Sequence, residues 1–270
     1  MNFTSFANRV LRLEDGVANI FLAGFTTPSS RAFAGNTYPV LFGVGYQRDA
    51  QGRVVVDGRG NANTNPTYGM PLADLNPKVI GKVQPDFTVG FTNSFSFRGF
   101  TLMAQVDWRK GGQAYSGNTR LARLYGQTEE TTDRESVNYV VPNASVWSGE
   151  VDGNNNPVYS NLPANNIQIA RNQNYWFGVL RSIDEAHVFD AGFVRLREVS
   201  LTYQFPKKWL KSLKLNSLSL SAIGRNLLLF TDYPGFDPET NLGGAVNGQG
   251  LEYVSLPQTK SYGISLKTTF

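Results

Sequence analysis

The segment that decides the fold is DFTVGFTNSFSF (86–97), followed by RG (98–99) and FTLMAQVDWR (100–109). Apolar side chains occupy alternate positions: Phe87, Val89, Phe91, Phe95 and Phe97, then Phe100, Leu102, Ala104, Val106 and Trp108. Small polar residues fill most positions between them; Asn93 and Met103 are the exceptions. Because successive side chains of a strand point to opposite faces, the segment predicts a hairpin. Each strand is long enough to cross a membrane, which takes roughly 9–11 residues.

The same alternation returns three times towards the end of the chain. One apolar series runs from Val199 to Phe205 and stops at Pro206, which cannot donate to a strand ladder. A second series runs from Ser217 to about Thr231. The third contains Tyr262, Ile264, Leu266 and Phe270. With weaker strands expected over about 3–13 and 38–46, the sequence predicts about seven strands.

The connections between these strands alternate between short and long. The turn at 98–99 and the connection 206–214 are short. By contrast, about 47–84, 110–190 and 232–256 are long and rich in Gly, Asn, Pro and Asp, so we expect little regular structure there. Transmembrane barrels have short turns at one end and long loops at the other, whereas compact soluble domains rarely carry such long loops. The expected fold is therefore all-β, an antiparallel transmembrane β-barrel.

The composition agrees with a β-rich chain. Of 270 residues, 13% are aromatic and only 17% charged, and the lack of Cys excludes disulfides, thiolate metal sites and Cys nucleophiles. No stretch approaches the ~20 apolar residues of a membrane-spanning helix, and the first residues do not resemble a signal peptide. The net charge is +4, without a dense basic stripe, and Lys207, Lys208, Lys211 and Lys214 form the one basic cluster. We interpret this cluster as a turn beside an anionic lipid surface and expect no nucleic-acid binding.

No combination of residues predicts catalysis or metal binding. His187 is the only histidine, and no nucleophile lies in a suitable motif near it. The run 152–156 lacks the Gly and Glu of a calcium loop. Asp237 and Glu239 are paired carboxylates in a loop, but acid–base hydrolysis would also need a cleft and a perturbed pKa. We therefore expect no catalytic residues, no metal and no cofactor.

Several longer motifs occur in a defined order. DAGFVRLREVSLTY (190–203) is followed by FP (205–206), GRNLL (224–228) and YPGFDPE (233–239), and is preceded by PDFT (85–88) and DWRKGG (107–112). In order and spacing, these motifs resemble the C-terminal region of SusC/RagA-type TonB-linked outer-membrane proteins over about 36–270. Several linked motifs in order are far more specific than any one of them.

The resemblance implies a β-barrel of about 22 strands with an internal plug, in the outer membrane of a Gram-negative bacterium. It implies import of oligosaccharides or peptides with a SusD-like surface lipoprotein, driven by the TonB–ExbB–ExbD complex. Residues 1–270 would be the C-terminal portion of this receptor, without its signal peptide, TonB box and plug domain. The terminal segment with Tyr262, Ile264, Leu266 and Phe270 resembles the signal that the barrel-assembly machinery reads.

Aromatic residues in the long loops are the candidates for ligand contact, because sugar rings and peptide side chains pack on aromatic faces. They are Tyr115, Trp147, Tyr175, Trp176 and Tyr233. The same residues could instead pack the loops together or contact the lipoprotein. Asp107 and Arg109 alternate with apolar residues of their strand, so we expect them to face the lumen, as channel lining or against the plug.

Two other classes of protein stay open. A secreted β-rich binding or adhesin module without a pore would bury its apolar faces between two packed sheets, whereas a barrel would expose them in one continuous band. The residues that distinguish these alternatives are Phe87, Phe91, Leu102, Val106, Leu201, Tyr203, Leu220, Ile264 and Leu266. An outer-membrane enzyme, the third class, lacks a credible catalytic triad.

Overall fold

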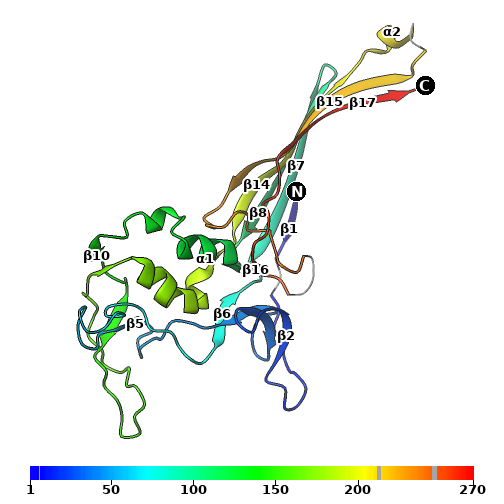
Figure 1. Ribbon diagram of the computed structural model, residues 1–270. Helices are drawn as coiled ribbons and strands as arrows, with labels where there is room; N and C mark the ends of the chain where they lie inside the picture. The colour runs from blue at the N-terminus through cyan, green and yellow to red at the C-terminus, as the bar shows by residue number, and fades with distance from the viewer. Residues whose placement is uncertain (6, 212–213, 245–247) are drawn as a thin grey trace.

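The computed structural model describes residues 1–5, 7–211, 214–244 and 248–270. A long twisted sheet forms one end of the molecule, and loops, short strands and short helices form a body at the other end (Figure 1). The sheet has the strand order β1-β7-β8-β14-β15-β17, with every neighbour antiparallel. The bounds are β1 Asn2–Thr4, β7 Phe87–Phe97, β8 Phe100–Lys110, β14 Phe193–Gln204, β15 Ser217–Phe230 and β17 Ser261–Thr269. The five strands predicted after residue 85 are confirmed, although β14 begins at Phe193 instead of Val199.

The register of the sheet places apolar residues opposite one another on successive strands. One row consists of Phe95, Leu102, Leu201, Ala222 and Ile264, and the next of Phe97, Phe100, Tyr203, Leu220 and Leu266. A row on the opposite face consists of Ser96, Thr101, Thr202, Ser221 and Ser265. Since directly opposed residues share a face, the sheet has one apolar face and one polar face.

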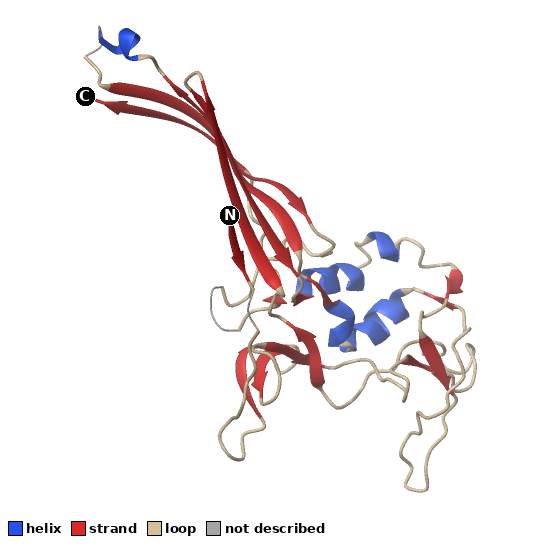
Figure 2. Cartoon of the chain, turned by 180° about the vertical axis from the view of Figure 1, so that it is seen from behind, coloured by secondary structure: helices blue, strands red, loops and turns tan. Residues whose placement is uncertain are grey.

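The apolar face is not covered by a second sheet. The side chains of Phe95, Leu201 and Ile264 are 69%, 46% and 82% exposed. Phe87 is half-buried, but its aromatic contacts are Phe3 and Trp108 of the same sheet. The nine apolar residues that distinguish a barrel from two packed sheets all lie outside the buried clusters of the described chain. The sheet stands clear of the body along most of its length (Figure 2), which is the arrangement expected for a barrel wall.

A β-bulge in β14 keeps the apolar residues on one face. The pairing with β8 is continuous up to Leu196 and resumes at Glu198, which leaves Arg197 without an opposite residue of its own. The pairing with β15 shifts at the same place. Because side chains alternate along a strand, the extra residue allows both Leu196 and Val199 to lie on the apolar face.

The connections are short at one end of the sheet and long at the other. Arg98 and Gly99, with φ of 46° and 86°, form the two-residue turn between β7 and β8, and these left-handed angles suit a tight hairpin. Helix α2 (Lys207–Leu210) lies in the other short connection, near the C-terminus (Figure 1). We call this the turn end. All three long connections project from the opposite end and form what we call the loop body.

The loop body contains more regular structure than the sequence predicts for these segments. Its antiparallel sheet consists of β2 (Asn19–Gly24), β3 (Ser29–Phe33), β4 (Val40–Gly43) and β6 (Lys78–Lys82). Three smaller sheets accompany it. The first joins β5 (Val54–Asp57) to β11 (Ala144–Trp147) in parallel, and the second joins β10 (Val137–Tyr139) to β12 (Ile169–Ala170). In the third, β9 (Gln113–Ser116) lies between β13 (Val188–Asp190) and β16 (Leu251–Glu252). The helical segments are α1 (Gly117–Leu124), η1 (Glu129–Thr131), η2 (Asn174–Val179), η3 (Leu180–Ser182) and η4 (Asp184–His187). The prediction of little regular structure in 110–190 is therefore wrong.

The two weaker strand predictions are only partly right. Within 3–13, strand structure occurs only in β1, and residue 6 lies outside the described residues. Within 38–46, β4 is a strand, but it pairs with β3 and β6 of the loop body and not with the long sheet. Its Val40 and Leu41 are buried in the body, so their apolar character reflects a local core.

The buried core of the molecule lies in the loop body. One cluster packs Val56, Tyr175, Trp176 and Ile183 together, and another joins Leu41, Tyr115 and Leu251. Each cluster contains residues from different long connections, which therefore fold as one body. Within the described residues, no helix is both long and apolar enough to cross a membrane. The described strands form an open sheet with β1 and β17 at its edges, and not a closed barrel.

Candidate functional site

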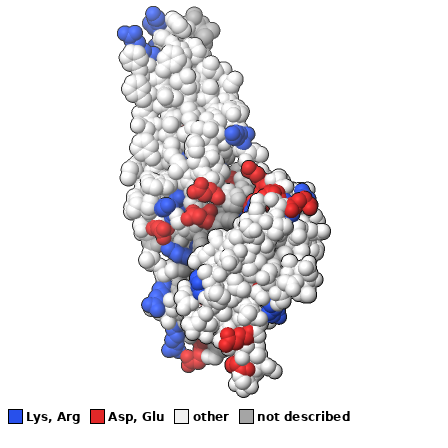
Figure 3. All heavy atoms as spheres, turned by 90° about the vertical axis from the view of Figure 1, so that its left-hand side faces the viewer, with Lys and Arg blue, Asp and Glu red and all other residues white. Residues whose placement is uncertain are grey.

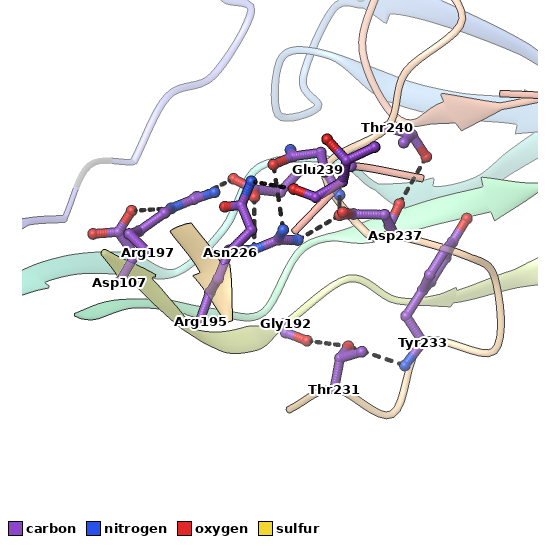
Figure 4. A network of polar contacts seen from close by, with 12 residues as sticks. Asp107, Gly192, Arg195, Arg197, Asn226, Thr231, Tyr233, Asp237, Glu239 and Thr240 are labelled. Atoms are coloured by element: carbon purple, nitrogen blue, oxygen red, sulfur yellow. Dashed lines mark hydrogen bonds and ion pairs between the residues drawn. The ribbon is translucent and has the colours of Figure 1, made fainter. Parts of the chain in front are cut away.

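A network of ion pairs lies on the polar face, where the sheet meets the loop body (Figure 4). It consists of Asp107 on β8, Arg195 and Arg197 on β14, and Asp237 and Glu239 from the connection that follows β15. We call these five residues the rim network. Arg195 and Arg197 are two positions apart, so ordinary strand alternation places both on the polar face, while Leu196 between them faces outward.

Glu239 joins the two arginines of the rim network. Its Oε2 lies 3.1 Å from Arg195 Nε, and its Oε1 lies 2.5 Å from Arg197 Nη2. Arg195 Nη2 also donates to Asp237 Oδ1 at 2.6 Å, and Arg197 Nε donates to Asp107 Oδ2 at 2.6 Å. The side chains of Arg195 and Asp237 are each 3% exposed. Each buried charge thus has a close partner of opposite sign, as burial of charge requires.

Local hydrogen bonds shape the loop that carries the two carboxylates. Asp237 Oδ1 accepts from the Glu239 backbone N at 2.9 Å, and Thr240 Oγ1 donates to the Asp237 carbonyl at 2.7 Å. Thr231 Oγ1 donates to the carbonyl of Gly192 at 2.7 Å and accepts from the backbone N of Tyr233 at 3.1 Å. These contacts hold the loop after β15 against the start of β14, so Asp237 and Glu239 act here as structural groups.

A cavity of about 460 Å³ opens beside the rim network and is lined by Val83, Gln84, Thr88, Asp107, Arg109, Phe193, Arg197, Glu239 and Gln249, among others. Arg109 Nη2 donates to the carbonyl of Val83 at 3.0 Å, whereas its buried Nε has no hydrogen-bond partner in the described structure. Asp107 and Arg109 lie on the face opposite the exposed Trp108. This placement suits their predicted lumen-facing role, which stays a prediction because the open sheet encloses no lumen.

The five loop aromatics predicted to contact ligand are all buried. Exposed fractions are 2% for Tyr115, 7% for Trp147, 5% for Tyr175, 5% for Trp176 and 4% for Tyr233. Tyr175 and Trp176 pack edge to face at 5.0 Å in the largest core cluster, and Tyr115 belongs to the second cluster. Their placement favours the alternative role of packing the loops together. Ligand contact by these five residues stays a prediction; among the other loop rings, Tyr125 and Phe236 are exposed by 70% and 62%.

The residues of the predicted assembly signal lie on the last strand of the sheet or directly after it. Tyr262, Ile264 and Leu266 are on the apolar face of β17, and Phe270 follows that strand. They are 78%, 82%, 63% and 85% exposed in that order. β17 pairs only with β15 among the described strands, so its other edge is open. Recognition by the assembly machinery remains a prediction for these residues.

His187 is a buried structural group of the loop body. Its Nε2 lies 3.1 Å from the carbonyl of Leu180, and its Nδ1 lies 3.5 Å from Arg123 Nη1. A carbonyl can only accept and a guanidinium can only donate, so Nε2 carries the proton and Nδ1 is the acceptor. Burial, together with the positive charge of Arg123, lowers the pKa of His187 to about 3. The ring is therefore neutral at ordinary pH and is poorly suited to acid–base catalysis.

The ion pairs of the rim network are not predicted from the sequence. Arg195 and Arg197 are two positions apart, and so are Asp237 and Glu239. Matching spacing of opposite charges in a chain with only 17% charged residues is the signal that could have suggested pairing. Among the described residues, no group of three or more His, Asp or Glu side chains is arranged to hold a metal ion.

Comparison with known proteins gives a consistent result. No family model matches the chain. Three curated proteins of Formosa agariphila are similar to it: TonB-dependent receptor P3 (28% identical, covering 74% of this chain and 18% of the receptor), P39 (25%, 71% and 17%) and P26 (25%, 90% and 24%). The chain thus spans about a quarter or less of the length of these relatives. The resemblance to TonB-linked outer-membrane proteins that the sequence predicts is confirmed.

Solved structures of similar fold include the RagAB peptide importer. In the closed-closed state the TM-score is 0.57 at 18% identity, and the match covers 98% of this chain and 26% of that chain. In the open-open state the TM-score is 0.57 at 17% identity, with 99% and 26% covered. The fold of this chain is therefore similar to that of part of the RagAB peptide importer.

The rim network predicts a large effect for a single uncharged substitution. Asp237→Asn leaves Arg195 buried beside a weakened partner, so the loop 231–256 should open more easily by roughly 3–5 kcal/mol. Hydrogen exchange of that loop measures the change. Glu198→Gln is the matched control, because it removes a 2.8 Å pair on the same sheet whose Arg225 side chain is 60% exposed. The control should cost under about 1 kcal/mol, and equal effects would contradict the role of burial.

The lowered pKa of His187 predicts that the loop body loses stability as the pH falls. The unfolded ring binds a proton near the ordinary pKa of 6.5, but the folded ring does so only near about 3. Between these values the unfolded state holds the extra proton, so stability should decrease by about 1.4 kcal/mol per pH unit on acidification.

The pH effect is measured by hydrogen exchange of residues 111–192 at a series of pH values. His187→Gln can keep the contacts with Leu180 and Arg123 without titrating, so its profile should lack this slope. Burial raises the pKa of Asp184, which acts in the opposite sense, and subtracting the variant's profile removes that contribution. Identical profiles for the parent and the variant would refute the assignment.

Proposed function

We propose that this chain forms wall strands and loops of an outer-membrane, TonB-dependent importer of oligosaccharides or peptides. The single observation that carries the proposal is the continuous apolar face of the six-stranded sheet, exposed on one side and backed by a polar face on the other. Lipid is the environment that suits such a face, because an exposed apolar band of this size is unfavourable in water. The long loops at one end and short turns at the other support the same assignment.

The open edges of the sheet support a larger barrel. Both β1 and β17 have one unpaired edge among the described strands. In a bilayer, unpaired backbone groups cost several kcal/mol each, so spanning sheets close on themselves. We propose that further strands of the same receptor complete a barrel of about 22 strands. In that barrel the polar face, with Asp107 and Arg109, would line the lumen or contact a plug.

The proposed mechanism is capture of ligand by the loops, followed by passage through the lumen when the plug moves. The rim network fixes the last long loop to the wall, which gives the ligand-binding surface a rigid support. Exposed rings such as Tyr125 and Phe236 are available for contact with sugars or peptides. RagAB, whose fold this chain resembles in part, is a peptide importer, and this similarity supports peptides as one substrate class for this chain.

The proposed partners follow from the same assignment. A SusD-like lipoprotein would cover the loop body, the TonB–ExbB–ExbD complex would supply energy, and the barrel-assembly machinery would insert the wall through its last strand. No residue of this chain has a proposed role in covalent chemistry. The alternative of a secreted adhesin module is disfavoured because the distinguishing apolar residues are exposed and not interdigitated between two sheets.

A pair of adjacent substitutions tests which face meets lipid. Leu201 lies on the apolar face and Thr202 on the polar face at nearly the same height in the sheet. Leu201→Arg should destabilise the inserted receptor by roughly 2–4 kcal/mol, because a lipid-facing charge is costly in a barrel wall. Thr202→Arg should have a much smaller effect.

The measurement is the amount of folded receptor in the outer membrane, with the substitutions made in the intact gene. Folded barrel is separated from unfolded chain by its altered migration in unheated gels. Equal loss in both variants would mean that the two faces do not differ in environment. A greater loss for Thr202→Arg would indicate a buried polar face and would refute the wall assignment.

A further inference from the structure

The turn end of the sheet carries a cluster of aromatic side chains. Phe100 packs on Tyr203 with ring centroids 4.6 Å apart, Tyr203 on Phe205 at 5.0 Å, and Phe205 on Trp209 at 6.2 Å. Trp209, in α2, is 54% exposed, whereas the next residue, Leu210, is 1% exposed and anchors this turn. The aromatic cluster therefore continues the apolar face up to α2. Aromatic rings at this position suit the boundary between hydrocarbon and headgroups.

Basic side chains lie directly beyond the aromatic cluster. Lys207, Lys208, Lys211 and Lys214 are all exposed, and the turn end also carries Arg98 and Lys267. The segments 87–106, 199–231 and 253–270, which contain most of the long sheet, have no Asp or Glu. Figure 3 shows acidic residues where the sheet meets the loop body and below it, whereas only basic residues are visible at the turn end. The positive charge of the turn end is thus not neutralised by acidic side chains within these segments.

We propose that the turn end binds the phosphate groups of anionic phospholipids in the adjoining leaflet. This inference rests on the proposed membrane wall and adds a lipid partner to it. Ammonium groups placed just outside an apolar band are at the height of the headgroups, and each basic residue near an anionic surface contributes attraction of about 1 kcal/mol. The lysine stems can lie along the apolar boundary while their charges reach the phosphates.

The arrangement favours lipid over another acidic partner. A binding site for nucleic acid or for an acidic protein would present its basic side chains on a surface that faces water, without an adjoining apolar face. Here the lysines adjoin the exposed rings of the aromatic cluster, so a ligand that meets both features needs an apolar part and an anionic part. A phospholipid has both, in the same order along its length.

Fluorescence quenching tests this inference on the whole receptor, as its gene encodes it, in nanodiscs that contain equal amounts of phosphatidylcholine and phosphatidylglycerol. In one preparation the phosphatidylcholine carries bromine, and in the other the phosphatidylglycerol does. The emission of Trp209 is obtained as the difference between the parent and Trp209→Phe. We expect brominated phosphatidylglycerol to quench Trp209 more strongly, through local enrichment on the order of tenfold.

Two variants connect the preference to charge. Replacing Lys207, Lys208, Lys211 and Lys214 with Gln should abolish the difference between the two lipids, whereas replacing the same four with Arg should retain it. High salt should weaken the preference in the parent, because exposed charges are screened.

The outcomes separate this inference from the proposed function. Equal quenching by both lipids in the parent would overturn the lipid inference and leave the membrane wall intact. Persistence of the preference in the Gln variant would also overturn it. An absence of quenching by either lipid would show that the turn end does not reach a bilayer, which would contradict the proposed function itself.

Discussion

Each strand of the long sheet keeps its apolar side chains on one face, and the rest of this structure depends on how β14 meets that condition. The sequence of β14 changes phase between Leu196 and Val199, which are both apolar but three positions apart. A regular strand would turn one of them to the polar face. The bulge at Arg197 absorbs the extra residue, so both lie outward and the neighbouring strands stay in register.

The polar face of β14 carries the link between the long sheet and the loops. With Arg195 and Arg197 both on the polar face, one carboxylate, Glu239, can contact both guanidinium groups. This arrangement brings the loop after β15 back across the sheet. Leu251 and Glu252, farther along that connection, then extend β9 of the loop body in parallel. Two arginines on one strand are in this way connected to the packing of loops that are distant in sequence.

The sequence is sufficient to predict the strands of the long sheet because their pattern has a simple physical cause. A sheet with one apolar face and one polar face requires strict alternation along each strand, and the segments 86–97, 100–109 and 261–270 follow it almost without exception. The start of β14 was missed because Arg195 and Arg197 replace the small polar residues of the pattern. The loop body was missed because its strands are short and pair with distant segments, which no local pattern encodes.

Burial explains why the candidate site was predicted less well than the fold. An aromatic residue in a polar loop can lie on the surface or beneath it, and sequence spacing does not distinguish the two. Tyr115 and Trp176 anchor cores, while Tyr125, one residue beyond α1, is exposed. The difference arises from long-range packing: Tyr115 contacts the cluster of Leu41 and Leu251, and Trp176 lies beside Ile183 and Val56. Which rings of the loops are exposed is therefore decided by which segments meet beneath the surface.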